Sequence, residues 1–100
     1  MIRHTAHVDT FARDRLPPPE QWPRLHFDLP ELRYPERLNC ATVLLDDAVA
    51  EGHGDRPAIL TEAGSISYRE LLARENRIAN VLQAQGIVPG NRVLLRGFNG

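Results

Sequence analysis

Regular hydrophobic patterning begins near Asn39 and predicts a helix there. Apolar side chains then recur three and four residues apart, and the Asn39 side chain can cap the free amides at the start of the helix. Asp46, Asp47 and Glu51 fall on the other face. Because neighbouring helical residues point in different directions, we interpret these carboxylates as a solvated face rather than an acid–base or metal pair. Gly52 suits the end of this helix. The apolar positions are Ala41, Leu44, Leu45, Ala48 and Val49.

A β-hairpin and a second helix follow. The apolar run Pro57 to Thr61 predicts a buried strand, residues 62–64 predict a turn, and residues 65–67 predict a second short strand. Ser67 and Glu70 have the spacing of a capping box, in which the serine oxygen accepts a helix amide and the glutamate reaches back. The helix should run to about Gln85. Its expected inner stripe comprises Leu71, Leu72, Ile78, Ala79 and Leu82.

A turn and a third strand are predicted after that helix. Gly86 suits a C-terminal cap, Pro89 and Gly90 suit a turn, and Arg92 to Arg96 reads as a core strand through its three central apolar residues. The segment Gly97 to Gly100 could begin a phosphate cradle, but the dinucleotide pattern needs further glycines and a helix. An ordinary strand-to-helix turn is the favoured interpretation.

Residues 1–38 form a different kind of segment, which we interpret as an extended N-terminal arm. Six of the eight prolines lie between Pro17 and Pro35. Residues 9–14 can make a helical turn or two, capped by Asp9 or Thr10 and ended by the prolines that follow Leu16. The large apolar side chains favour an arm that packs along a larger body. A polyproline ligand for an aromatic groove is the alternative.

Composition excludes several kinds of chemistry. The net charge is −1, which argues against nucleic acid as a partner. All twelve basic residues are arginine, so no lysine nucleophile or Schiff base can form in these residues. Cys40 is the only cysteine and is interpreted as a small buried hydrophobe. His4, His7, His26 and His53 lack metal-ligand spacing. The first nine residues do not resemble a signal peptide and no apolar run could span a membrane, so a cytoplasmic location is expected by default.

The residues at the ends of these predicted helices and strands resemble those in the N-terminal part of the acyl-CoA synthetase family of AMP-forming ligases. The similar segments are Asn39 with Leu44 to Asp46, Gly54 to Ala58, Tyr68 to Leu71, and Gly86 to Val93. The chain departs from the pattern at Asn91, where aspartate is usual, although either residue suits a turn. The arm, from Thr5 to Pro23 and from Tyr34 to Asn39, is similar to the leader of aromatic-acid ligases, with the 2-aminobenzoate–CoA ligase group nearest and the benzoate–CoA ligases close to it.

The resemblance implies an α/β fold: the incomplete start of a large AMP-binding domain over residues 39–100, with two main helices and short strands, preceded by the Pro-rich arm over 1–38. It also implies a parent enzyme that uses ATP, Mg²⁺ and coenzyme A. That enzyme would join an aromatic carboxylate to coenzyme A through an acyl-adenylate. No residue here matches a catalytic, cofactor-binding or metal-binding motif of the family, so the chain alone is expected to be inactive scaffold that packs on the remainder of the parent domain.

A function of another class stays open. The chain can instead be a stand-alone interaction module that uses its proline- and aromatic-rich arm as a ligand, without catalysis. About sixty residues follow the arm, and a chain of that size buries only ~60% of its unfolded surface. A cooperative unfolding transition of residues 39–100 would favour the module. A molten product would favour a segment that lacks its partner layers.

Overall fold

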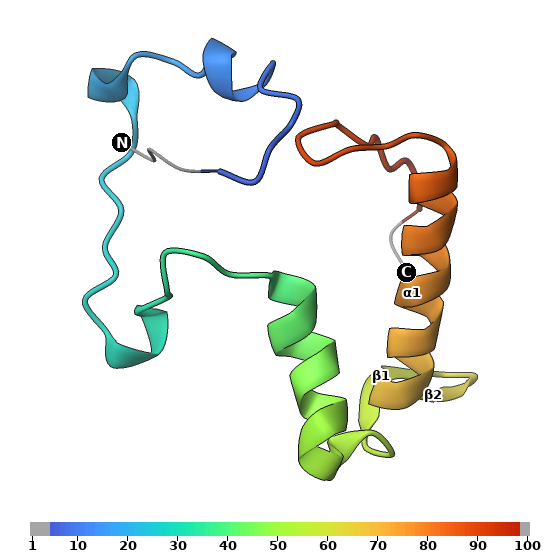
Figure 1. Cartoon of the computed structure of the whole chain (residues 1–100). Helices are drawn as coiled ribbons and strands as arrows, with labels where there is room; N and C mark the ends of the chain where they lie inside the picture. Colours follow the sequence, from blue (N-terminus) through green and yellow to red (C-terminus); the bar gives the residue numbers. More distant parts are fainter. Residues whose placement is uncertain (1–4, 99–100) are drawn as a thin grey trace. The chain divides into compact units, whose positions relative to one another are not determined.

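A computed structural model describes residues 5–98 and divides the chain into two compact units. One unit combines Met1–Leu25 with Leu82–Gly100, and the other is His26–Val81. Each unit is described by itself. The units group residues by proximity and do not test the sequence-based division into 1–38 and 39–100, which stays a prediction. The elements include one helix α1 and a two-stranded hairpin, β1 and β2, which are labelled in Figure 1.

The proline-rich segment alternates between extended backbone and single helical turns. These short 3₁₀ turns span Arg13–Arg15, Pro19–Gln21 and Pro30–Leu32. The predicted turn after Asp9 is confirmed, since the Asp14 amide donates to the Thr10 carbonyl at 2.9 Å. It ends as expected at Leu16, whose ψ of 150° is extended, because the prolines that follow disfavour a helical conformation before them.

The first predicted helix is present over residues 40–53, with wide π-type turns at Thr42–Asp46 and Val49–His53. Asn39 caps it as predicted: its Oδ1 accepts the amides of Ala41 at 3.0 Å and Thr42 at 3.3 Å. Gly52 has a φ of +88°, the left-handed conformation expected at the helix end. The apolar face is only half-buried and Leu44 is exposed, while the three carboxylates face solvent.

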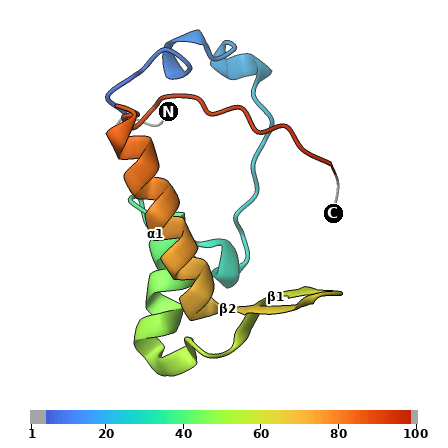
Figure 2. The same ribbon diagram turned by 90° about the vertical axis from the view of Figure 1, so that its right-hand side faces the viewer.

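The predicted hairpin is confirmed. Strand β1 (Pro57–Thr61) pairs antiparallel with β2 (Gly64–Ser67), and a two-residue turn joins them. Ile59 lies opposite Ile66, and a bulge separates that pair from the pairing of Pro57. Figure 2 shows the hairpin leading directly into α1. The expected burial of β1 is wrong: Leu60 is 78% exposed, because a two-stranded sheet with no layer packed on it leaves its faces open.

Helix α1 spans Tyr68–Ala84 and begins with the predicted capping box. The Ser67 hydroxyl accepts the Glu70 amide at 3.2 Å, and Glu70 Oε2 accepts the Ser67 amide at 2.8 Å. The Ser67 amide, then the Ser67 hydroxyl and the nearby Arg74 charge, hold the pKa of Glu70 below its ordinary value. At the other end, Ile87 N donates to Leu82 O at 3.0 Å around Gly86, whose φ is +77°, which is a Schellman cap.

Burial differs most from the sequence-based expectation. In the part of the chain that the structure describes, no hydrophobic side chain is fully buried. Leu71, Leu72 and Leu82 of the predicted stripe are half-buried, but Ile78 and Ala79 are exposed. Cys40 is exposed too, so its interpretation as a buried hydrophobe is wrong. Apolar spacing selects the face of a helix, but only a packed partner element buries that face.

The predicted strand at Arg92–Arg96 is wrong for this chain. Residues 91–98 have no regular secondary structure, and Leu94 is 92% and Leu95 89% exposed. A strand exists only through hydrogen bonds to a neighbouring strand, and among residues 5–98 only β1 and β2 pair. The apolar run is therefore unpaired within the described part of the chain. The phosphate-cradle hypothesis for Gly97 to Gly100 involves Asn99 and Gly100, which lie outside the described residues.

Candidate functional site

Two of the segments that carry the family resemblance contact each other where α1 begins. We call this contact the helix-start joint (Gly54–Arg56 with Ser67–Glu70). The first amides of a helix have no partner within the helix. Here the Tyr68 amide donates to the Arg56 carbonyl at 3.0 Å, and the Arg69 amide donates to the Gly54 carbonyl at 2.9 Å. Ser67 takes the next amide, so all three are satisfied. The segment before the hairpin thus accepts hydrogen bonds from the first amides of the helix that follows the hairpin.

Gly54 is buried in the helix-start joint. A Cβ there would lie 2.7 Å from Nη2 of Arg69, but that atom is the end of a long side chain that is 62% exposed, so it can move aside. The Arg69 guanidinium also lies 3.4 Å from Oδ1 of Asp55, in an exposed ion pair of little energetic weight. The Gly54-Asp55-Arg56 motif therefore closes the joint through its backbone carbonyls. It presents no reactive group.

The second group meets in the other unit, where the arm contacts the turn after α1; we call this the arm–turn joint (Val8–Phe11 with Val88–Arg92). The amides of Val8 and Asp9 both donate to the Pro89 carbonyl, at 2.8 and 3.0 Å. Figure 1 shows the two segments in dark blue and red. The contact joins residues about eighty positions apart.

Asp9 is the polar centre of the arm–turn joint. Its Oδ1 accepts the Phe11 amide at 3.0 Å, and its Oδ2 accepts Asn91 Nδ2 at 2.8 Å and Arg92 Nη1 at 3.0 Å. The Phe11 amide foremost, then the Asn91 amide and the Arg92 charge, hold the pKa of Asp9 below its ordinary value. The Asp9 side chain is 28% exposed. It is therefore held as a carboxylate in a partly shielded position.

Phe11 completes the joint as an aromatic platform. The guanidinium carbon of Arg15 lies 3.7 Å from the centre of the Phe11 ring, and that of Arg92 lies 4.5 Å from it. Both distances are in the cation–π range. Arg92 thus contacts the arm twice, through the carboxylate of Asp9 and through the ring of Phe11.

Asp9 should titrate below its ordinary value of 3.8. The bond from the Phe11 amide lies within the arm, so only the part of the lowering that comes from Asn91 and Arg92 is linked to docking. That part stabilises the docked arm above the ordinary pKa, and this stabilisation is lost as pH falls through the lowered pKa. Carbon-13 NMR of the Asp9 carboxyl should therefore give a midpoint under 3.8 in the whole chain. In Asn91→Ala, which removes a donor, the midpoint should rise. An unchanged midpoint in that variant would contradict the role of Asn91.

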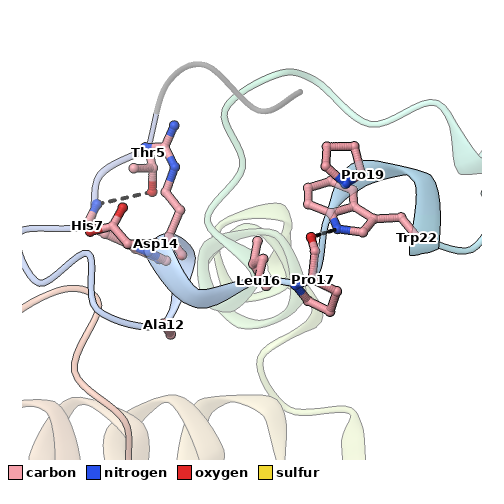
Figure 3. A pocket seen from close by; sticks show the side chains of 9 residues that line it. Thr5, His7, Ala12, Asp14, Leu16, Pro17, Pro19 and Trp22 are labelled. Carbon is pink, nitrogen blue, oxygen red and sulfur yellow. Dashed lines mark hydrogen bonds between the residues drawn. The ribbon is translucent and has the colours of Figure 1, made fainter.

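A pocket of about 610 Å³ lies within the arm itself. Figure 3 shows Trp22 beside Pro19, with its indole N–H directed to the Pro17 carbonyl, and the Trp22 Nε1 to Pro17 O distance is 2.6 Å. The indole donor is thus used within the arm. The walls are mainly apolar and are formed by Thr5, His7, Ala12, Arg13, Asp14, Leu16, Pro17, Pro19 and Trp22.

Two hydroxyls of the arm are used in local hydrogen bonds: Thr5 Oγ1 accepts the His7 amide at 3.2 Å, and Thr10 Oγ1 donates to Asp14 Oδ2 at 2.8 Å. Within residues 5–98, no three His, Cys, Asp or Glu side chains are grouped so as to hold a metal ion. His26 and His53 each lie near one carboxylate, at 3.4 and 4.0 Å, and His4 lies outside the described residues. Over the same range, no helix is long and apolar enough to cross a membrane. What the arrangement does chemically is fix backbone segments against each other.

Comparison with known proteins decides the family. Residues 46–100 match the family described as AMP-binding enzyme, which is more than half of the chain. The chain belongs to the AMP-binding enzyme family. The matched region contains the helix-start joint and the turn half of the arm–turn joint. The predicted resemblance to adenylate-forming ligases is thereby confirmed at the level of the family.

The relatives of this family member include aromatic acid–CoA ligases. It is 39% identical over 64 residues to 3-hydroxybenzoate–CoA/4-hydroxybenzoate–CoA ligase of Thauera aromatica, covering 64% of this chain and 12% of the relative. It is 35% identical over 72 residues to benzoate–CoA ligase of the same organism, covering 71% and 14%. An acetyl-coenzyme A synthetase of Cupriavidus metallidurans is 41% identical over 63 residues, covering 58% and 10%. The chain thus spans about a tenth of these relatives, and no solved structure matches it.

Proposed function

We propose that the chain is the N-terminal scaffold segment of a cytoplasmic, AMP-forming aromatic acid–CoA ligase whose acid is 2-aminobenzoate. The match of residues 46–100 to the AMP-binding family carries this proposal. The benzoate and hydroxybenzoate ligases among the relatives support an aromatic acid. The choice of 2-aminobenzoate rests on the similarity of the proline-rich arm.

The whole enzyme would work in two steps. The carboxylate of the acid attacks the α-phosphate of ATP, forming an acyl-adenylate and releasing pyrophosphate. The thiol of coenzyme A then attacks the acyl carbon, forms the thioester and releases AMP. Magnesium would neutralise phosphate charge, and since no group of side chains in residues 5–98 fits a metal ion, its ligands would belong to the rest of the enzyme.

The role of this segment would be to position backbone. At the helix-start joint, the Gly54 and Arg56 carbonyls are occupied by the first amides of α1. At the arm–turn joint, the Asp9 carboxylate is occupied by three donors. Groups that are already paired within the chain are poor candidates for contact with ATP or the acid. The exposed run of Val93 to Leu95 would instead join the sheet of the parent domain.

A chimeric enzyme tests the scaffold role. The segment of benzoate–CoA ligase of Thauera aromatica that matches residues 46–100 is replaced by those residues, and benzoate-dependent ATP–pyrophosphate exchange is measured. We expect exchange with the host's KM for benzoate and its order of preferred acids, because the grafted residues supply support only. A host that lacks the segment should be inactive. A chimera that changes its preferred acid would overturn the scaffold role.

The substrate is tested separately on the protein encoded by the whole open reading frame that contains these residues. Thioester formation with coenzyme A is compared for 2-aminobenzoate, benzoate, 3-hydroxybenzoate and acetate. We expect the highest kcat/KM with 2-aminobenzoate. A preference for acetate would remove the aromatic assignment but keep the family. The 100-residue chain by itself should give no ATP–pyrophosphate exchange, and robust exchange by that chain would contradict the proposal as a whole.

A further inference from the structure

Asn91 makes two side-chain hydrogen bonds of opposite polarity. Its Oδ1 accepts the Val88 amide at 3.0 Å, which closes the turn after α1. Its Nδ2 donates to Oδ2 of Asp9 at 2.8 Å, which joins the turn to the arm. An aspartate at this position could accept from Val88, but it has no hydrogen to donate to another carboxylate. The amide of asparagine is therefore what makes the turn and the arm compatible.

The arm presents a complementary set of groups. Its backbone amides at Val8 and Asp9 share the Pro89 carbonyl, and the Asp9 carboxylate accepts from Asn91 and Arg92. The remaining carboxylate oxygen accepts the Phe11 amide, which holds the side chain in place. Charged acceptors make stronger hydrogen bonds than neutral ones. A carboxylate at position 9 thus accepts hydrogen bonds from three donors, and an apolar side chain there would leave all three without this acceptor.

Close backbone approach is the third element. Gly90, with a φ of +96°, lies at the centre of the turn, and a Cβ there would overlap the carbonyl oxygen of Asp9 and lie 3.0 Å from the Cβ of His7. The arm therefore occupies the space that a side chain at position 90 would fill. The turn therefore fits the arm in shape, through the open space at Gly90, and in charge, through Arg92.

We propose that the Val88–Arg92 turn is a docking site for an extended segment that contains an aspartate. Its occupant is residues 8–11 of this same chain. Asn91 makes the site specific for a carboxylate at position 9. The proposal goes beyond the ligase assignment and does not depend on it. The rival explanation is a general attraction between Arg92 and the carboxylates of the arm, in which any of those carboxylates would serve.

Docking can be measured in the whole chain with a nitroxide label. Cys40→Ser removes the native thiol, and Ala6→Cys places the label on an exposed position of the arm. A docked arm broadens the amide signals of Gly90 and Asn91 in a proton–nitrogen spectrum. The signals of α1 in the same spectrum report whether each variant has kept its fold.

Three variants separate the explanations. Asn91→Asp should abolish the broadening, since two carboxylates would face each other where a 2.8 Å bond now lies. The exchanged pair Asp9→Asn with Asn91→Asp should restore part of it: the amide of residue 9 can donate to the carboxylate of residue 91 and Phe11 keeps its acceptor, while Arg92 loses its acceptor on residue 9 and keeps its contact with the Phe11 ring. Asp14→Asn is the matched control: it removes one negative charge from the same arm at a residue outside the arm–turn joint, whose carboxylate accepts the Thr10 hydroxyl at 2.8 Å, and it should leave the broadening intact.

Each outcome supports or overturns the proposal, and a loss in Asn91→Asp that the exchanged pair does not restore counts against it. Loss in Asn91→Asp with recovery in the exchanged pair supports a matched pair of residues. An equal loss of broadening in Asp14→Asn would overturn the proposal and favour the general attraction between Arg92 and the carboxylates of the arm. Broadening that persists in Asn91→Asp while α1 keeps its signals would show that Asn91 does not select the arm, and it would overturn the proposal.

Discussion

Heated in a scanning calorimeter, the 100-residue chain should show no sharp heat-absorption peak. It should also enhance the fluorescence of the dye ANS before any heating. Both results are expected because, in residues 5–98, no hydrophobic side chain is fully buried. A cooperative peak requires many apolar contacts that break together, and the half-buried faces of the helices do not supply them.

The balance of free energies explains the size of this effect. Ordering the backbone costs about 1–2 kcal/mol per residue, and burial of apolar surface returns about 25 cal/mol per Å². Val93 to Leu95 and most of the apolar arm remain in solvent, so they return little. The hydrogen bonds at the two joints are net contributors of only about 1 kcal/mol each. Local structure can persist on these terms, but a cooperative core cannot.

The chimera with benzoate–CoA ligase provides the comparison, since residues 46–100 would there have partner layers and should melt with the host in one transition. A specific enthalpy near 0.7 kcal/mol per residue, the usual value for globular proteins, from the isolated chain would contradict the expectation. That result would instead favour the stand-alone interaction module, since it would mean that residues 39–100 form a core without a partner.

Local structure was predictable because local rules determine it. The capping box of Ser67 and Glu70 depends on four consecutive residues, and its bonds are present as predicted. Gly52 and Gly86 end their helices with positive φ because side chains there would be strained. The hairpin likewise follows from two apolar runs and a short turn. None of these features needs a contact with a distant part of the chain.

Burial and strand pairing were not predictable in the same way. The run from Val93 to Leu95 has the composition of a core strand, yet it is unpaired here. Its β propensity describes fitness for a sheet and does not create the neighbouring strand. Ile78 is exposed on α1 for the same reason. The apolar pattern identifies which surface can be buried, but burial requires a packed or paired element that these residues do not supply themselves.

Asn91 lies between these two cases. Its suitability for a turn was predictable, and the bond from the Val88 amide confirms it. Its second bond, to Asp9, joins positions 82 residues apart. A single sequence carries no spacing signal for such a pair, so the view that aspartate and asparagine are equivalent here holds only for the turn. The structure shows that the amide also contacts the arm, which an aspartate could not do as a donor.

Gly90→Ala should release the arm, whereas Gly86→Ala should not. Both glycines have positive φ, +96° and +77°, so an alanine at either position incurs conformational strain of about 1–2 kcal/mol. The difference is the space around them. A Cβ on Gly86 would meet nothing within 4 Å, while a Cβ on Gly90 would overlap the backbone carbonyl of Asp9.

The two substitutions should therefore separate in one spectrum of the labelled chain. Gly90→Ala should remove the broadening of the turn by the label at position 6 and leave the amide shifts of α1 in place. Gly86→Ala should shift the signals at the end of α1, where Ile87 bonds to Leu82, and keep the broadening. If Gly90→Ala also kept it, the arm would not be held by close backbone approach, and the side-chain pair of Asp9 and Asn91 would have to hold it alone.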